Sequence, residues 1–131
     1  MIRLTLIMIA VSWAVASSAL ADHTLPTSGD YQAYCQESIK VYDGKPADQS
    51  AAGICLGFVE GAMEMHAALN ASDGATPFYC MSEHGISGFD AILTWNKYLK
   101  NHQDELGKSP IITFVLAIRE AFPCPETQPA Q

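Results

Sequence analysis

Positive charge is scarce in this chain. It has 7 lysine and arginine residues against 14 aspartate and glutamate residues, which gives a formal net charge of −7 at pH 7. Because nucleic acids and anionic lipid surfaces attract basic proteins, this balance argues against both as partners. An acidic surface instead suits a soluble protein, or one that binds a basic protein such as an enzyme acting on an anionic polymer.

The spacings that hold metals and nucleotides are also missing. No two cysteines are separated by two residues and no two histidines by three, so neighbouring zinc ligands are not expected. No glycine-rich loop stands between a strand and a helix, which argues against a nucleotide. His66 falls on the apolar side of a predicted helix and is interpreted as a core or boundary residue. We therefore expect neither a metal nor a cofactor.

Catalysis is not expected either. The stretch Ser82-Glu83-His84 contains the residue types of a catalytic triad. However, consecutive side chains point away from one another, so they cannot align a nucleophile, a base and an orienting carboxylate. The sequence therefore predicts a protein that is not an enzyme.

No apolar run reaches the roughly 20 residues that a membrane-spanning helix needs. The longest, residues 4–15, follows Arg3 and precedes an A-x-A motif at residues 19–21, the pattern of a secretory leader with its cleavage site. A retained membrane anchor is the alternative. Cleavage would leave residues 22–131 as a single domain that begins at Asp22. Loss of Arg3 would leave six cations against fourteen carboxylates, a formal charge of −8.

Four segments carry apolar residues at helical spacing, at residues 28–42, 48–69, 87–101 and 110–122. Ser28, Asp48, Ser87 and Ser109 stand where N-caps are expected. The expected buried faces are Tyr31, Cys35, Ile39 and Tyr42; Ile54, Cys55, Phe58, Val59, Ala62, Met65, His66 and Leu69; Phe89, Ile92, Leu93 and Leu99; and Ile111, Phe114, Val115, Ile118 and Phe122.

The last segment has a strand as its alternative, because residues 111–118 form a continuous apolar run. Pro110 at a first helical turn and Pro123 at the stop favour a helix. No stretch alternates convincingly with a period of two. The sequence therefore predicts an all-α fold, and its short connections favour a small antiparallel four-helix bundle.

The four cysteines all follow the predicted cleavage site. An even number in a small exported chain indicates two disulfides, with free thiols and a metal site as less favoured alternatives. In an up-and-down bundle, Cys35 and Cys55 lie level in the first hairpin. Cys80 before the third helix and Cys124 after the fourth meet at the opposite end. We therefore predict the pairs Cys35 with Cys55 and Cys80 with Cys124.

Three glycines recur at intervals of four in the second predicted helix, at Gly53, Gly57 and Gly61. Each costs an exposed helix about 1 kcal/mol relative to alanine. Such spacing is typical of a shallow groove that lets a neighbouring helix approach closely. We predict a helix-packing groove, with a partner-binding groove as the alternative.

Several short elements match one family. They are Cys35, the stretch C-L-G-F-V-x-G from Cys55 to Gly61, Phe78-Tyr79-Cys80, Tyr98-Leu99 and Ala121-Phe122-Pro123-Cys124. Together they resemble the Rap/Tai family of bacterial immunity proteins, and they span nearly the whole chain after the leader.

The resemblance implies a small helical periplasmic protein that protects its producer from peptidoglycan amidases injected by type VI secretion. Such proteins occlude the active-site cleft of the toxin, commonly as dimers, and need no chemistry of their own. Partner contacts are then expected in the loops at residues 70–79, 81–86 and 102–108. The candidate contact residues are Asp73, Glu83, His84, Asp104 and Glu105.

Two other interpretations stay open. In the first, the loops are solvated turns, because loops carry function only when a rigid scaffold presents them. The second alternative for the function is a periplasmic acid-stress chaperone of the HdeA type, which is also small, helical and disulfide-bearing, or a family member without a toxin partner.

Overall fold

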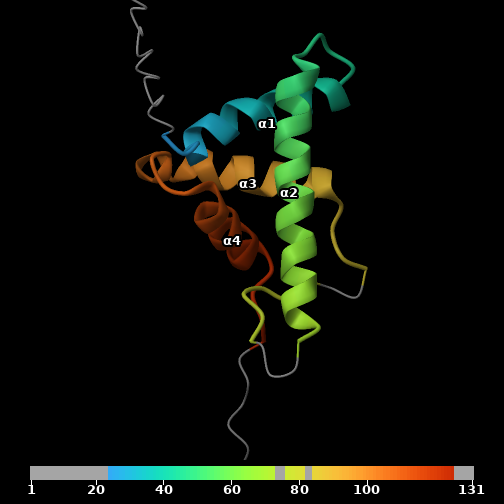
Figure 1. Cartoon of the computed structure of the whole chain (residues 1–131), viewed down its shortest axis with the longest axis vertical. Coiled ribbons are helices and arrows are strands. Elements are labelled where there is room, and N and C mark those ends of the chain that lie inside the picture. The colour runs from blue at the N-terminus through green and yellow to red at the C-terminus, as the bar shows by residue number, and fades with distance from the viewer. Residues whose placement is uncertain (1–23, 73–75, 82–83, 126–131) are drawn as a thin grey trace, which may run out of the picture.

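The computed structural model describes residues 24–72, 76–81 and 84–125, which form four α-helices and one short 3-10 helix (Figure 1). The elements in chain order are α1 (Ser28–Tyr42), α2 (Gln49–Asn70), α3 (Gly88–Asn101), η1 (Gln103–Glu105) and α4 (Pro110–Ala121). The all-α prediction is confirmed, and the helix boundaries agree with the predicted ones to within a residue. The predicted leader at residues 1–21 and the candidates Asp73 and Glu83 lie outside the described residues.

Capping side chains explain where three of the helices begin. Asp48 caps α2 and Ser87 caps α3, as predicted. For α1 the cap is Thr27 and not the predicted Ser28. The Thr27 hydroxyl accepts from the Asp30 N–H, and the Asp30 carboxylate accepts from the Thr27 N–H at 2.8 Å. This reciprocal pair forms a capping box and fixes the first turn of α1.

Figure 1 shows α2 along the long axis of the molecule, with α1 and α3 lying across it and α4 beside it, below α3. The most extensive helix contact joins α1 to α2, whereas α3 packs against α1, α2 and α4. The small helical bundle is therefore confirmed, and both α1 and α3 contact the three other α-helices.

The core is centred on Trp95 of α3. Its ring lies 5.3 Å from that of Phe58 in α2, 5.5 Å from that of Phe114 in α4 and 6.1 Å from that of Tyr31 in α1. The Trp95 indole N–H donates to the Thr113 hydroxyl at 3.0 Å, so its only polar atom is satisfied. One side chain thus joins all four helices.

A buried hydroxyl pair ties the start of α1 to the start of α4. The Ser28 and Thr113 hydroxyls lie 2.8 Å apart, and Ser28 Oγ donates to the Lys108 carbonyl at 2.9 Å. Both side chains are fully buried. Since an unpaired buried hydroxyl is costly, these bonds specify how α1 sits on the linker before α4. Ser28 therefore serves the core and not the helix cap.

The predicted buried faces are partly confirmed. Buried as predicted are Cys35, Cys55, Val59, His66, Ile92, Leu99, Phe114 and Ile118. Six apolar residues predicted to be buried are exposed instead: Tyr42, Ile54, Met65, Leu69, Leu93 and Ile111. The physical reason is that α2 is about 33 Å long at 1.5 Å per residue. α1 and α3 cover only part of this length, which leaves Ile54, Met65 and Leu69 of α2 uncovered.

Both predicted disulfides are present. Cys35 pairs with Cys55 between α1 and α2, and Cys80 pairs with Cys124, joining the segment before α3 to the end of α4. Their sequence separations are 20 and 44 residues. Loops of these lengths give each bridge about 3 to 4 kcal/mol of stabilisation in the chain-entropy model.

The helix-packing groove is contradicted by the structure. A Cβ atom built on Gly53, Gly57 or Gly61 would meet no other atom within 4 Å, apart from the chain neighbours and the helix's own backbone. All three glycines face outward. No helix packs on the stripe itself, because α1 and α3 contact α2 through other residues, such as the buried Cys55 and Val59.

Replacing Gly57 by alanine should therefore stabilise the protein. Since the new methyl group enters open space, we expect the free energy of unfolding to rise by about 1 kcal/mol from helix propensity alone. Urea unfolding followed by circular dichroism measures the difference. The matched control Ala52→Gly, at a buried α2 position, should destabilise. A decrease in stability for Gly57→Ala would show that a helix does pack on this stripe.

Candidate functional site

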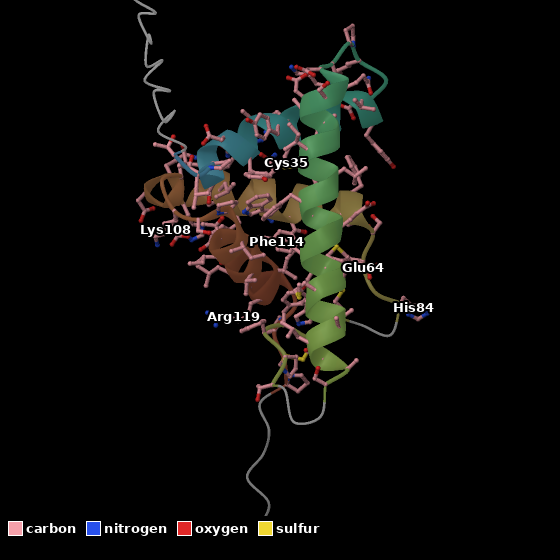
Figure 2. The ribbon with its side chains drawn as sticks, in the orientation of Figure 1. Cys35, Glu64, His84, Lys108, Phe114 and Arg119 are labelled. Atoms are coloured by element: carbon pink, nitrogen blue, oxygen red, sulfur yellow. A yellow bond between two sulfur atoms is a disulfide. The ribbon has the colours of Figure 1, made fainter. Side chains whose placement is uncertain are left out.

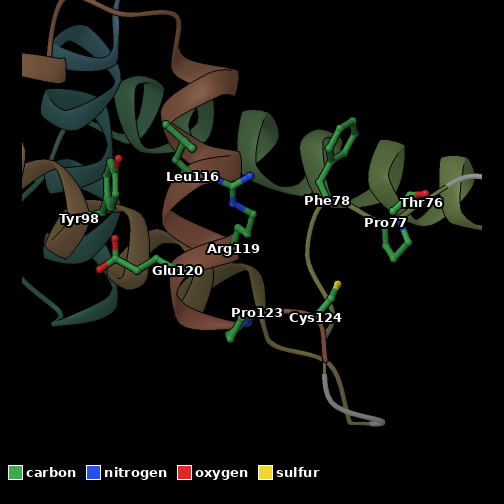
Figure 3. A pocket seen from close by; sticks show the side chains of 9 residues that line it. All are labelled: Thr76, Pro77, Phe78, Tyr98, Leu116, Arg119, Glu120, Pro123 and Cys124. Atoms are coloured by element: carbon green, nitrogen blue, oxygen red, sulfur yellow. The ribbon is translucent and has the colours of Figure 1, made fainter. Parts of the chain in front are cut away.

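An open hollow of about 800 Å³ lies beside the Cys80–Cys124 disulfide (Figure 3). It is bounded by the segment before Cys80, one side chain of α3 and the last turns of α4. Its lining residues are Thr76, Pro77, Phe78, Tyr98, Leu116, Arg119, Glu120, Pro123 and Cys124.

Three interactions hold the segment that directly follows Phe78. The disulfide fixes Cys80 to Cys124, and the Cys80 N–H donates to the Phe122 carbonyl at 3.0 Å. The neighbouring Tyr79 is buried, while Phe78 itself is 56% exposed. An aromatic side chain is therefore presented to solvent directly before a stretch of fixed backbone.

Tyr79 is anchored by His66 of α2. The two rings stack with centroids 3.6 Å apart, and Asn70 Nδ2 lies 3.2 Å from the His66 ring nitrogens. Burial lowers the pKa of His66 below its ordinary value of 6.5, since only 7% of the residue is exposed. Burial likewise raises the pKa of Tyr79, whose hydroxyl has no hydrogen-bond partner among the described residues. The prediction that His66 is a core or boundary residue is confirmed.

Tyr98 forms the α3 wall of the hollow, and its hydroxyl is already engaged. It donates to Glu105 Oε2 at 2.9 Å, and Lys108 Nζ lies 2.9 Å from the other Glu105 oxygen. Burial, followed by the bond to Glu105, raises the pKa of Tyr98 to about 12. The Tyr98 ring also stacks on His102, with centroids 4.0 Å apart. Tyr98 therefore contributes a rigid apolar surface and no titratable group at neutral pH.

The α4 wall of the hollow carries charge. Arg119 and Glu120 are exposed on the last turn of α4, and Arg119 forms no ion pair within the described part of the chain. Figure 3 shows Arg119 and Phe78 on the two sides of the hollow. We call Pro77, Phe78, Leu116, Arg119 and Glu120 the Phe78 corner.

The predicted contact residues do not form one site. His84 is exposed before α3, and Figure 2 places it on the other side of α2 from Arg119. Asp104 is exposed on η1, whereas Glu105 is occupied by Tyr98 and Lys108. Sequence reasoning did not single out Phe78 and Arg119 as candidates, although both line the hollow. A signal was present, since Phe78 lies between a proline and a cysteine where no helical pattern runs.

The corner has the composition of a protein interface. Exposed aromatic side chains and arginine dominate the binding energy of protein complexes, and a fixed backbone lowers the entropy lost on docking. Among residues 24–72, 76–81 and 84–125, no group of three His, Cys, Asp or Glu side chains is placed to hold a metal ion. None of the helices that the structure describes is long and apolar enough to cross a membrane.

These features define a small disulfide-linked helical protein with a rigid surface suited to binding another protein. The family model of Rap1a immunity proteins matches residues 27–124, and the chain belongs to this family. The predicted resemblance is thereby confirmed, and it supports an immunity role over the acid-stress chaperone. No curated protein and no solved structure matches the chain.

The buried His66 should make stability depend on pH. An unfolded chain binds a proton at His66 near pH 6.5, whereas the folded chain does so only at lower pH. The contribution is therefore fully present above pH 6.5 and is lost as the pH falls, by at most about 1.4 kcal/mol per pH unit.

The measurement is urea unfolding at pH 7.5 and 5.0 for the wild type and for His66→Phe, which retains a ring to stack on Tyr79. The loss of stability between the two pH values should be smaller in the variant. An equal loss in both proteins would contradict the assignment of a buried neutral imidazole to His66.

Proposed function

We propose that this protein is a periplasmic immunity protein that binds a peptidoglycan amidase delivered by type VI secretion. It blocks the active site of that amidase and performs no catalysis itself. Membership of the Rap1a immunity family supports binding to a toxin. Two disulfides in a chain with a predicted leader support an oxidising compartment outside the cytoplasm.

The observation that carries the proposal is the Phe78 corner. An apolar ring stands outward from a segment fixed by the Cys80–Cys124 disulfide, with the Arg119 cation across the hollow. An amidase that acts on peptide stems has a cleft shaped for an extended chain. A rigid projecting side chain can fill such a cleft at little cost in conformational entropy.

Charge supports the same kind of partner. The chain has an excess of seven carboxylates over cations, which favours association with a basic protein through a faster encounter. Enzymes that bind anionic polymers carry such basic surfaces. In this proposal the acidic surface draws the amidase in, and the Phe78 corner provides the close contact.

Truncating Phe78 should weaken binding with little effect on folding. Because the side chain is more than half exposed, its removal leaves no internal cavity. We expect Phe78→Ala to raise the Kd for the amidase encoded beside this gene by about thirtyfold, the size of an interface hot spot near 2 kcal/mol. Arg119→Ala should act in the same direction.

The assay is calorimetric titration, together with release of peptide stems from peptidoglycan by the amidase. Ile112→Ala is the matched control, because Ile112 is an equally exposed apolar residue on α4 outside the hollow. It should bind and inhibit like the wild type. Failure of the wild type to bind the neighbouring amidase would overturn the proposed function.

Export should be visible in the mass of the protein. After expression of the full gene in a Gram-negative host, the periplasmic protein should begin at Asp22, since the leader is cut at the A-x-A motif. Mass spectrometry of the periplasmic fraction measures this. Ala21→Phe should block cleavage, because the site requires a small residue. A wild-type chain found uncut in the membrane fraction would support the anchor instead.

A further inference from the structure

A second exposed surface runs along α2 on the side that faces the start of α3. It consists of two hollows of about 340 Å³ and 600 Å³, which follow one another along α2. The α2 residues that line them are Gln49, Ala52, Gly53, Leu56, Gly57, Glu60, Gly61, Met63 and Glu64. We call this surface the α2 groove. It shares no lining residue with the Phe78 corner.

The first end of the groove is apolar and rigid. Tyr42 of α1 is 71% exposed, yet its ring stacks on Phe89 of α3 with centroids 3.7 Å apart. Leu56 is also exposed and reaches across to Gly88 at the start of α3. A stacked aromatic pair beside an aliphatic side chain forms a preorganised site for an apolar group.

The middle of the groove is exposed helix backbone. Gly53, Gly57 and Gly61 lower helix stability, and no contact within the described residues compensates, because nothing approaches their Cβ positions. The absence of side chains lets another polypeptide segment approach the α2 backbone closely.

The second end of the groove is acidic. Glu60 and Glu64 are the only charged residues of α2, and they lie one turn apart on the same face. Neither forms an ion pair with any residue that the structure describes. Glu60 is oriented by its contact with Gly88, whose Cβ position lies 3.5 Å from Glu60 Cγ. This places two carboxylates beside an open backbone.

We propose that the α2 groove binds a segment of the effector that carries an apolar side chain for the Tyr42–Phe89 end and a lysine or arginine for Glu60 and Glu64. This inference rests on the proposed function and identifies a second contact with the same partner. The occupant is a basic segment because the groove has two unpaired carboxylates and α2 has no cation. A second copy of this chain would bring four carboxylates into one interface and no α2 cation, which is unfavourable.

The test is the affinity of groove variants for the amidase encoded beside this gene. Gly57→Leu places a large side chain in the middle of the groove, where the helix backbone is exposed. Leucine is also a better helix former than glycine. We expect it to fold normally and to raise the Kd by about tenfold or more. The double variant Glu60→Gln and Glu64→Gln should lower the association rate and reduce its dependence on salt.

Asp43→Asn is the charge control. It removes a carboxylate from the turn before α2 that is already paired with Lys45 at 2.9 Å and lines neither hollow of the groove. It should leave both the Kd and the salt dependence close to those of the wild type. Gly57→Ala, with a much smaller side chain, should weaken binding less than Gly57→Leu.

Each outcome decides a different statement. If the wild type binds the amidase and the groove variants bind equally well, this inference is wrong and the proposed function stands. If the wild type does not bind, both are wrong. If ultracentrifugation shows a dimer that Gly57→Leu converts to monomers while the affinity for the amidase is unchanged, the occupant is a second copy and the inference is overturned.

Discussion

The fold depends on the packing of one indole ring. Trp95 contacts aromatic side chains from α1, α2 and α4, and its N–H is bonded to Thr113, which in turn contacts Ser28. A domain of this size has room for only a modest core. Because one large residue contacts all the other α-helices, this modest core is enough to hold the four helices together. It also leaves long stretches of α2 without a neighbour.

The disulfides fix parts of the chain that the packing around Trp95 does not reach. Cys35–Cys55 locks α1 onto α2 near the core, whereas Cys80–Cys124 holds an irregular segment against the end of α4. The second bridge has the clearer functional consequence. With Tyr79 buried against His66 and Cys80 bonded, the adjacent Phe78 is left exposed on a fixed backbone. The same bond therefore contributes to stability and holds the backbone next to an exposed aromatic ring.

The two exposed surfaces differ in chemistry, which is consistent with two separate contacts. The Phe78 corner combines an aromatic ring with an arginine, and the α2 groove combines an aromatic pair with two glutamates. Both are open to solvent, and both use side chains held by neighbouring packing. In each case the binding group is preorganised, which reduces the entropy lost when a partner docks. Such surfaces suit an inhibitor that acts by occupancy.

Much of the structure followed from local chemistry in the sequence. Caps, prolines and helical periodicity predicted four helices because these signals act within a few residues. The cysteine pairing followed because short connections bring only certain ends together. The role of Ser28 could not be predicted, since its partner Thr113 lies 85 residues away. The stripe of Gly53, Gly57 and Gly61 predicted close helix packing, but which side of α2 is covered depends on how α1 and α3 cross it. The Phe78 corner could not be predicted for the same reason, since the exposure of its residues depends on tertiary packing. Exposure depends on contacts between distant segments, so only the tertiary structure decided which residues remain free to meet a partner.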